Sequence, residues 1–262
     1  MQKELSANPV VNLRDAFLAA CNGAGYTLNL LFDTILWFRA IPKKKNEIVN
    51  YMSLATFGSM PVTFIVAMFS GMILALQTGV EFRRYGQEAT IGTVVAAAVC
   101  RDLGPVMTCF ALAGLIGSTI ASEIATMKVS EEIDALEVMS INPVYYLVMP
   151  RVITLALVAP LLTIFSDLIG ILGGEIVGYY VFNVDFDVYF QKARGILELK
   201  DVYGGLLKSI VFGITISTIA CSQGLRAENG AVGVGQATLR TVVLSFIFIL
   251  IFDYFLTGAI YR

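Results

Sequence analysis

Four charged residues stand inside long apolar runs of the sequence: Arg101, Asp102, Asp167 and Glu175. Placing a charged side chain at the centre of a membrane span costs about 2.5–3.5 kcal/mol on translocon scales. Each of these four residues therefore needs an interaction partner or has a functional role. Neighbouring helical residues point about 100° apart, so Arg101 and Asp102 cannot pair face to face with each other. The pair is either a polar helix break satisfied by neighbouring spans or a device for passing or gating a lipid headgroup. For Asp167 and Glu175, a structural or water-facing role is favoured over catalysis.

A second set of charged residues lies in the polar segment between residues 128 and 151. Its apolar positions recur at i, i+4 and i+7, and acidic residues cover the other faces, which predicts a short amphipathic helix. We expect Ser130 to cap this helix and prolines to separate it from the next one. Two roles stay open, docking into a partner's groove or a solvated connector. The apolar stripe is Val129, Ile133 and Leu136, and the acidic residues are Glu131, Glu132, Asp134 and Glu137.

Several kinds of chemistry are excluded by residue content. The 262 residues include no histidine, which removes Ser-His-Asp and Cys-His catalysis and His-ligated metals. No phosphate-binding loop is present, because the glycines at 230, 233 and 235 have no Gly-Lys-Ser/Thr after them. A net charge of -2 gives no indication of nucleic-acid binding. We therefore expect no catalytic site, no metal and no cofactor in this chain, and any ATP to be used by another subunit.

The elements that position these residues are membrane spans. The sequence is 57% hydrophobic and 15% charged, and no charged residue occurs from Ile48 to Val80, where about 20 residues would suffice to cross a bilayer. The second apolar stretch is too long for one span, so a helix break is expected at residues 101–105, which include Pro105. A Gly-rich loop is expected at 223–236. The predicted spans are residues 52–80, 89–122, 151–182, 204–222 and 238–260.

The N-terminal part is predicted to lie along the membrane rather than to cross it. Residues 14–40 are apolar but interrupted by polar residues, and they favour an amphipathic interfacial helix with Trp37 at headgroup level. The competing interpretation is a first full span across 16–32. The chain then divides into a cytoplasmic segment, 1–46, and a five-span domain, 47–262. The lysines at 43–45 place the N-terminus in the cytoplasm and the C-terminus outside.

Small residues four positions apart predict where the spans touch. Gly170, Gly174 and Gly178 form two overlapping steps of this kind, and Gly213 begins another. Such residues let helix backbones approach closely in lipid, where no hydrophobic force drives helices together. We expect these faces to be buried between spans.

Several segments in order along residues 50–260 carry a family resemblance. They are Ser-Gly-Met-Ile-Leu-Ala-Leu-Gln at 70–77, Arg-Asp-Leu-Gly-Pro-Val at 101–106, Ala-Ser-Glu-Ile at 121–124, the acidic run 131–139 with Ile-Asn-Pro at 141–143, Pro-Arg at 150–151, and Gly-Ala-Val-Gly-Val-Gly at 230–235. Together they resemble the MlaE permease family, the membrane subunits of ABC transporters that work with MCE lipid-binding proteins. Three departures are visible: the family usually has Glu at the position of Asp102, residues 114–117 lack a basic residue often found there, and Glu132 stands where some members have Gln.

The resemblance implies an all-α integral protein of the bacterial inner membrane with an N-terminal interfacial helix, five spans and a cytoplasmic coupling helix between the second and third. It implies a homodimer with a cytoplasmic ABC ATPase, a periplasmic MCE protein and a small STAS-like subunit, moving phospholipids or related lipids. ATPase coupling would fall to Glu131, Glu132, Asp134, Leu136 and Glu137. Family position assigns lipid binding to Leu76, Val80, Phe82, Arg101, Phe248, Phe252 and Phe255.

Other interpretations of the same residues stay open. The phenylalanines at 248, 252 and 255 share one helix face, which also suits ordinary bundle core or a lipid-facing surface. An ATPase-independent secondary transporter or channel would use Arg101, Asp102, Asp167 and Glu175 as an ion relay, and it would show inverted repeats, which the sequence lacks. An intramembrane enzyme ranks lowest, because the sequence has no catalytic motif.

Overall fold

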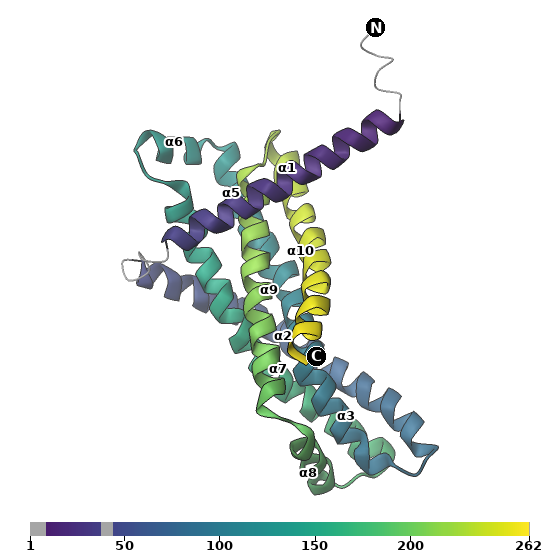
Figure 1. The fold of residues 1–262 in the computed structure, drawn as a ribbon. Coiled ribbons are helices and arrows are strands. Elements are labelled where there is room, and N and C mark those ends of the chain that lie inside the picture. Colours follow the sequence, from purple (N-terminus) through teal and green to yellow (C-terminus); the bar gives the residue numbers. More distant parts are fainter. Residues whose placement is uncertain (1–8, 38–43, 262) are drawn as a thin grey trace.

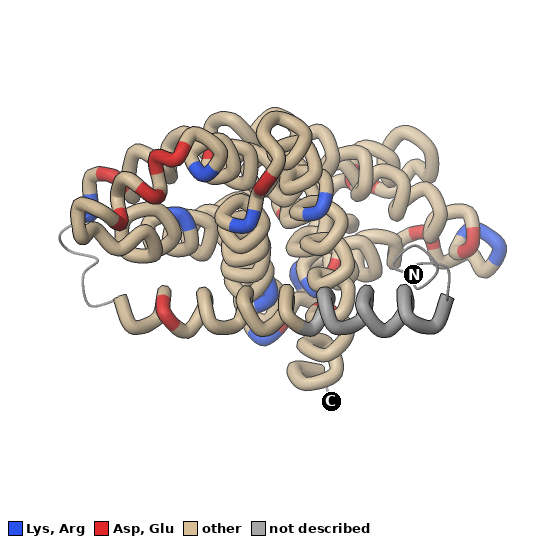
Figure 2. The backbone as a smooth tube through the Cα atoms, turned by 90° about the horizontal axis from the view of Figure 1, so that it is seen from above, with Lys and Arg blue, Asp and Glu red and all other residues tan. Residues whose placement is uncertain are grey.

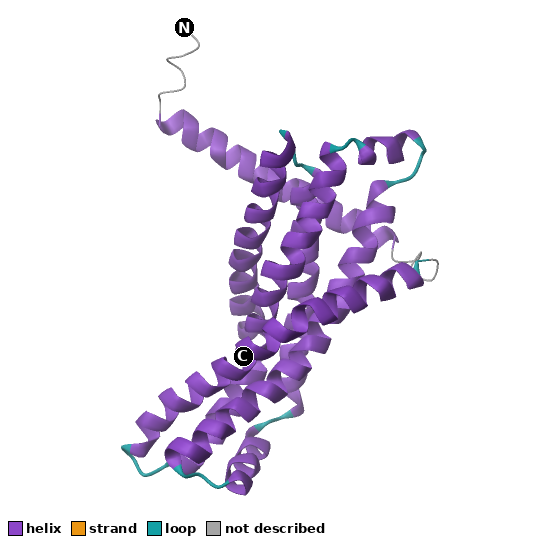
Figure 3. Cartoon of the chain, turned by 180° about the vertical axis from the view of Figure 1, so that it is seen from behind, coloured by secondary structure: helices purple, strands orange, loops and turns teal. Residues whose placement is uncertain are grey.

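The chain is a bundle of helices in the computed structural model, which describes residues 9–37 and 44–261, with side chains from residue 22 onward in the first range (Figure 1). Within those ranges helices are joined by short loops and no strand occurs (Figure 3). The α-helices are α1 (Pro9–Leu36), α2 (Lys45–Arg83), α3 (Ile91–Ala98), α4 (Gly104–Leu112), α5 (Ser118–Val129), α6 (Glu132–Val138), α7 (Met149–Phe182), α8 (Phe186–Ile196), α9 (Leu199–Leu225) and α10 (Gly230–Tyr261).

Five helices among the described residues are long and apolar enough to cross a membrane, as the sequence predicts. Each begins earlier than predicted, and all but the third also end later. The second joins α3, α4 and α5 into one helix, and a π turn precedes α7. The five are Lys45–Arg83, Glu88–Val129, Val144–Phe182, Leu199–Leu225 and Gly230–Tyr261.

The helix break expected at residues 101–105 is wrong. The chain passes through this stretch in a π turn, Val99–Leu103, and α4 follows without interruption. The Gly104 N–H bonds to the Val99 carbonyl, five residues back, and this wider turn accommodates Pro105, which has no N–H of its own. A second π turn, Ala113–Gly117, joins α4 to α5.

The Gly-rich loop expected at 223–236 is also wrong in its extent. α9 continues to Leu225, and α10 begins at Gly230, directly after Asn229 in the left-handed region with φ of 65°. A Cβ at Gly233 would collide with the Glu228 carbonyl, so the tight entry into α10 depends on glycine there. The glycines of this segment therefore begin a helix instead of forming a loop.

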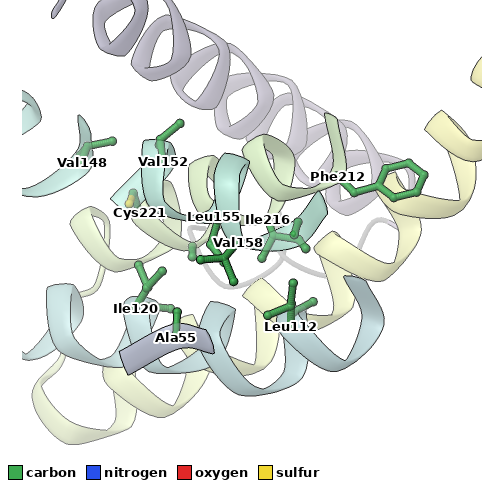
Figure 4. Packing of buried hydrophobic residues seen from close by; sticks show 14 of the residues in the cluster. Ala55, Leu112, Ile120, Val148, Val152, Leu155, Val158, Phe212, Ile216 and Cys221 are labelled. Carbon is green, nitrogen blue, oxygen red and sulfur yellow. The ribbon is translucent and has the colours of Figure 1, made fainter. Parts of the chain in front are cut away.

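The core lies where α5, α7 and α9 meet. Leu155 and Val158 of α7 pack with Phe212 and Ile216 of α9, all with almost no exposed surface (Figure 4). Near α8 a second cluster surrounds Tyr189, whose hydroxyl donates to the Ile171 carbonyl at 3.2 Å. The two clusters fix α7 as the central helix of the bundle.

Glycines make the close helix contacts, as predicted. A Cβ at Gly71 of α2 would run into the Gly170 carbonyl of α7, and one at Gly213 would run into the Leu155 carbonyl. A Cβ at Gly174 would lie 2.6 Å from the Tyr189 hydroxyl. These contacts exclude any side chain, so the predicted packing faces at Gly170, Gly174 and Gly213 are buried between helices.

α1 crosses the α6 end of the bundle, and from above it runs as a straight helix along one side (Figures 1 and 2). Thr27 shares a hydrogen bond of 2.7 Å with Ser222 of α9, and Leu30 is buried. Leu28 and Phe32 are exposed, so part of the predicted apolar stripe faces away from the protein. α1 is not among the five spanning helices, which counts against a first full span across 16–32.

α9 and α10 differ sharply in how well the chain covers them. In the most apolar stretch of α9 67% of residues are buried, whereas in that of α10 the share is 11%. α10 packs on α9 and α5 through a line of small residues, Gly233, Ala237, Thr241 and Ser245, and its other faces are open. Lipid or another protein must cover those faces.

Candidate functional site

Arg101 and Asp102 each find a partner on α9, as expected for charges that cannot pair with each other. Arg101 Nε donates to Asp201 Oδ1 at 2.8 Å, and its Nη2 donates to Oδ2 at 3.1 Å. Asp201 also accepts from the Glu198 N–H in the capping box that begins α9. The guanidinium lies over the Tyr261 ring, with 38% of its side chain exposed. Arg101 is therefore held in place but still accessible.

Lys208 is the centre of the cluster, and its side chain has no exposed surface. The ammonium group donates to the Asp102 carboxylate, lies 3.0 Å from Asp253 Oδ1 and donates to Thr257 Oγ1 at 2.7 Å. It also donates to the Arg101 carbonyl at 2.9 Å. One ammonium group thus joins the π turn and α10 to α9.

Proline chemistry explains why Lys208 lies at this point. Pro105 has no N–H to give to the Arg101 carbonyl four residues earlier, and the Lys208 ammonium takes its place. The neighbouring Cys100 carbonyl faces Gly205 of α9, where a Cβ would collide with it. The π turn and the facing side of α9 are therefore complementary in shape. The Lys208 ammonium supplies the hydrogen bond that Pro105 cannot donate.

Sequence analysis missed three members of this cluster, Asp201, Lys208 and Asp253. The available signal was Lys208, the one charged residue of the predicted fourth span, and Asp253 inside the fifth, which need partners as much as Arg101 does. Asp201 and Lys208 are seven residues apart, so they share one face of α9. With Arg101 and Asp102 the cluster holds two cations and three carboxylates.

Asp167 and Glu175 lie apart from this cluster. Asp167 is buried, and its Oδ1 sits against Gly104, where any side chain would collide with it. That oxygen has no hydrogen-bond partner within the described ranges. Glu175 is half-buried two turns later on α7. The structure does not bring the two carboxylates together. Within the described residues no group of Cys, Asp or Glu is arranged to hold a metal ion.

The predicted acidic helix is present as α6, between the second and third spans. Ile133 is 2% exposed and anchors α6 to the core, with Leu136 half-buried beside it. Glu131, Glu132 and Glu137 are exposed. Asp134 is exposed as well and accepts a hydrogen bond of 2.7 Å from Lys128 Nζ. The helix thus presents carboxylates outward while one apolar side holds it to the bundle.

The expected Ser130 cap is wrong. The Ser130 hydroxyl donates back to the Thr126 carbonyl at 2.9 Å, and the residue before α6 is Glu131. Glu131 and Ser140, on either side of α6, both have φ of 60°, in the left-handed region that non-glycine residues rarely adopt. The chain therefore reverses direction at Glu131, and a hydroxyl directed back into α5 cannot reach the N–H groups of α6.

A hollow of about 530 Å³ lies between α6, α1 and the connection to α7. Tyr26 of α1 and Glu137 of α6 contribute to its lining. Burial raises the pKa of Tyr26, although Arg226 nearby acts in the opposite direction. α1 and α6 thus face each other across this hollow, which polar and apolar residues line together.

Arg101 aside, which lies in the π turn, the residues predicted to bind lipid fall on two helices with different main partners. On α2, which packs on α7, Leu76 and Val80 are exposed and Phe82 is half-buried. On α10, Phe248 and Phe252 have ring centroids 6.0 Å apart, and Phe252 packs against the core. Phe255 is 65% exposed. A single chain offers these residues as two separate surfaces.

Five apolar helices with charged residues paired inside the bundle define a multi-pass membrane protein. The model of one family, Permease MlaE, matches residues 48–259. The chain belongs to the MlaE family of ABC transporter permeases.

Relatives support the family over most of the chain. A "Probable ABC transporter permease protein" of Rickettsia typhi is 45% identical over 206 residues, 79% of this chain and 80% of that protein. One from Synechocystis is 37% identical over 218 residues, 83% of each. The chloroplastic protein TRIGALACTOSYLDIACYLGLYCEROL 1 of Arabidopsis thaliana is 36% identical over 204 residues, 78% of this chain and 58% of that protein.

Proposed function

We propose that this chain is the permease subunit of an ABC transporter that moves phospholipids or related lipids between the inner membrane and a periplasmic MCE carrier. A separate cytoplasmic ATPase supplies the energy, and this chain itself holds no cofactor. The observation that carries the proposal is the structure of α6 in a chain of this family. This helix lies between two spans, is anchored to the bundle by one apolar side, and has its carboxylates directed outward. The name of the Arabidopsis relative contains that of a galactolipid, which supports a lipid as the transported molecule.

α6 suits the contact with the ATPase. Ile133 fixes the helix to the core, so movement of α6 is transmitted to α5 and α7 instead of being lost in a loose loop. Glu131, Glu132 and Glu137 are exposed and available to basic groups of a partner. Leu136, half-buried, completes an apolar patch at the base of the helix. We propose Glu131, Glu132, Asp134, Leu136 and Glu137 as the coupling residues.

This assignment sets the orientation. If α6 meets the ATPase, the α6 end and α1 are cytoplasmic and the α8 end is periplasmic. Residues 1–46 then form the interfacial segment, and Lys44 at its end pairs with Glu47 at 2.8 Å, with its ammonium 3.8 Å from the centre of the Tyr146 ring. The exposed Leu28 and Phe32 of α1 would lie in the membrane interface. Lys43, part of the predicted lysine anchor, lies outside the described residues.

The lipid path requires a second copy of the chain. α10 is largely uncovered, and its Phe255 is exposed, so a homodimer through this region would close a cavity between the copies. Leu76, Val80 and Phe82 would add apolar surface from α2, and Phe248, Phe252 and Phe255 from α10. Arg101, still 38% exposed, would stand at the polar side of that cavity. A periplasmic MCE protein would receive the lipid, and a small STAS-like subunit completes the proposed complex.

The rival hypothesis of an ATPase-independent transporter or channel loses support. The charged cluster is the kind of feature that ion pathways use, but Lys208 has no exposed surface and is bound by four oxygen atoms. Family membership among ABC transporter permeases also points to an ATPase.

Affinity purification in mild detergent tests the proposal. The chain should bring down an ABC ATPase, and ATP hydrolysis by the purified complex should respond to added phospholipid. A chain that purifies without any nucleotide-binding subunit while retaining transport would contradict the assignment.

Photo-crosslinking in membranes tests the lipid path separately. Probes at Leu76 and Phe252 should give lipid adducts that depend on ATP, whereas a probe at Leu157 of α7, which is exposed, should label independently of ATP. Equal labelling at the three positions would show only contact with the bilayer and would remove these residues from the path.

A further inference from the structure

An ion pair closes the connection that carries α6. Arg151, near the start of α7, donates from Nη2 to Glu123 Oε2 of α5 at 3.0 Å. The two residues are 28 positions apart along the chain, and α6 lies between them. The pair therefore joins the two membrane spans between which α6 is suspended.

The guanidinium of Arg151 is held by three parts of the bundle. Arg151 is 4% exposed, and its Nη1 donates to the Leu147 carbonyl at 2.9 Å, within the π turn Val144–Val148. The guanidinium also lies over the Tyr51 ring of α2, 5.0 Å from the centre. One side chain thus contacts the first span, the second span and the entry into the third.

The apolar anchor of α6 rests on the same junction. Ile133 is buried in one core cluster with Ile124 of α5 and Val148 of the π turn. Ile124 directly follows Glu123, and Val148 is three residues before Arg151. Apolar packing is non-directional, so it lets these segments slide, whereas a hydrogen-bonded ion pair fixes their relative position. A displacement of α6 therefore first reaches the two segments that the pair ties together.

The surroundings of the pair suit positioning better than stabilisation. The Arg151 side chain is 5% exposed, but that of Glu123 is 48% exposed. Arg151 Nε has no acceptor among the residues that the structure describes. Apolar residues in place of a buried pair are often equally stable or more stable, so stability gives little reason for a charge here. The planar guanidinium does, because it holds two acceptors in fixed directions.

We propose that Arg151 and Glu123 are positioning residues for ATPase coupling, whose pair makes α6 move together with α5 and α7. Without the pair, α6 would still bind the ATPase, because its exposed carboxylates are untouched. Its displacement would instead be absorbed between the two spans. The movement itself comes from the proposed contact with the ATPase, so this role rests on the proposed function.

The amount of lipid transferred per ATP hydrolysed tests the role in the purified complex. Glu123→Ala should lower this ratio by about fivefold, the effect of losing one modest hydrogen bond, while the ATPase still co-purifies. Glu88→Ala is the matched control. Glu88 Oε1 lies 3.9 Å from Arg83 Nε, and this pair closes the connection between the first and second spans at the other end of the bundle. The control should keep the wild-type ratio.

A double variant separates positioning from stability. Glu123→Ala leaves the buried Arg151 cation without its carboxylate, so the thermal unfolding midpoint should fall. Glu123→Gln with Arg151→Met removes both charges and keeps side chains of similar size, so the midpoint should return toward that of the wild type. The ratio of lipid to ATP should stay low, because no fixed link between α5 and α7 is restored.

Spin labels measure the position of α6 without the ATPase. Val138→Cys on α6 and Val49→Cys on α2 place both labels at exposed positions of the full-length chain. The distance between the labels should be narrowly distributed while the pair is intact, including in the Glu88→Ala variant. Both variants of the pair should give a clearly broader distribution.

Three results would overturn the proposal. They are a wild-type ratio of lipid to ATP in Glu123→Ala, a ratio that recovers with the midpoint in the double variant, and label distances that do not depend on the pair. Failure of the proposed function looks different. If the wild type shows no ATP-dependent transfer but its label distances depend on the pair, the positioning of α6 stands and the transporter assignment falls.

Discussion

The charged cluster around Lys208 and the acidic helix α6 place their charges in opposite surroundings. The Lys208 ammonium has no exposed surface and joins Asp102 and Asp253 across three helical segments. On α6, Glu131 and Glu132 are exposed, and the neighbouring pair of Asp134 with Lys128 is itself open to solvent. The charged side chains around Lys208 are largely enclosed by the bundle, whereas those of α6 are exposed.

The difference indicates two uses of charge in one membrane protein. Inside the bundle a charged group is tolerated when every partner is in place, so the cluster fixes how α9 and α10 meet the π turn. At α6 the exposed carboxylates contribute little to stability, because exposed pairs are worth about 0–1 kcal/mol. They are therefore free to recognise another protein. Variants that disturb only one of the two regions should therefore change either stability or partner binding, but not both.

Lys208→Met should have the largest effect on stability. It leaves the Asp102 and Asp253 carboxylates without their cation and the Arg101 carbonyl without a donor, and loss of one member of a buried pair costs about 3 kcal/mol or more. Thermal unfolding in detergent should show a clearly lower midpoint. Lys192→Met, at an exposed position on α8, is the matched control and should leave the midpoint unchanged.

A second substitution tests whether the loss of stability comes from the unpaired carboxylates. Adding Asp102→Asn to Lys208→Met removes one of the two orphaned carboxylates, so part of the lost stability should return. If the double variant is as unstable as the sum of the single variants, the two side chains do not act as a pair.

Gly174→Leu should have the next largest effect. The new side chain would meet the Tyr189 hydroxyl and Val95, and overpacking of this kind costs about 2 kcal/mol. Gly58→Leu on α2 is the control, because a Cβ at Gly58 has no neighbour within 4 Å. Equal unfolding midpoints for the two variants would move Gly174 out of the packed interior.

Charge reversal on α6 should barely change stability. Changing Glu131, Glu132 and Asp134 to lysine removes one exposed pair and the acidic first turn of α6, a loss of about 1 kcal/mol. The same variant should lose ATPase co-purification and lipid transfer, since like charges would now face the partner.

The matched control reverses three acidic residues at the other end of the bundle. Glu81, Asp185 and Asp187 are all exposed near α8, and their reversal should leave the ATPase bound. Retention of the ATPase by the α6 variant, or its loss from the control, would break the distinction between the two regions.

Ser140→Gly should give the smallest change, and in the stabilising direction. Ser140 has φ of 60° after α6, and glycine adopts this conformation without steric cost, so a gain of about 0.5 kcal/mol is expected. Asn229→Gly, at φ of 65°, should gain less because asparagine already tolerates the left-handed region. Unfolding midpoints of the two variants check the order.

The sequence predicts the elements better than the contacts between them. Span number and α6 follow from apolar run length and from the spacing of Ile133 and Leu136, which are local properties. The partners of Lys208 do not, because Asp102 is more than a hundred residues away along the chain. The π turn before Pro105 and the left-handed Glu131 were missed for a related reason: packing with α9 and the return of the chain to α7 override local preference.

The most direct test is ATP-dependent lipid transfer by the purified complex. Proteoliposomes containing this chain and its co-purified ATPase are mixed with a soluble MCE carrier, and movement of labelled phospholipid between membrane and carrier is followed with ATP or a non-hydrolysable analogue. We predict transfer that requires ATP hydrolysis and disappears when α6 carries reversed charges. Transfer at the same rate without ATP, or driven by an ion gradient alone, would contradict it.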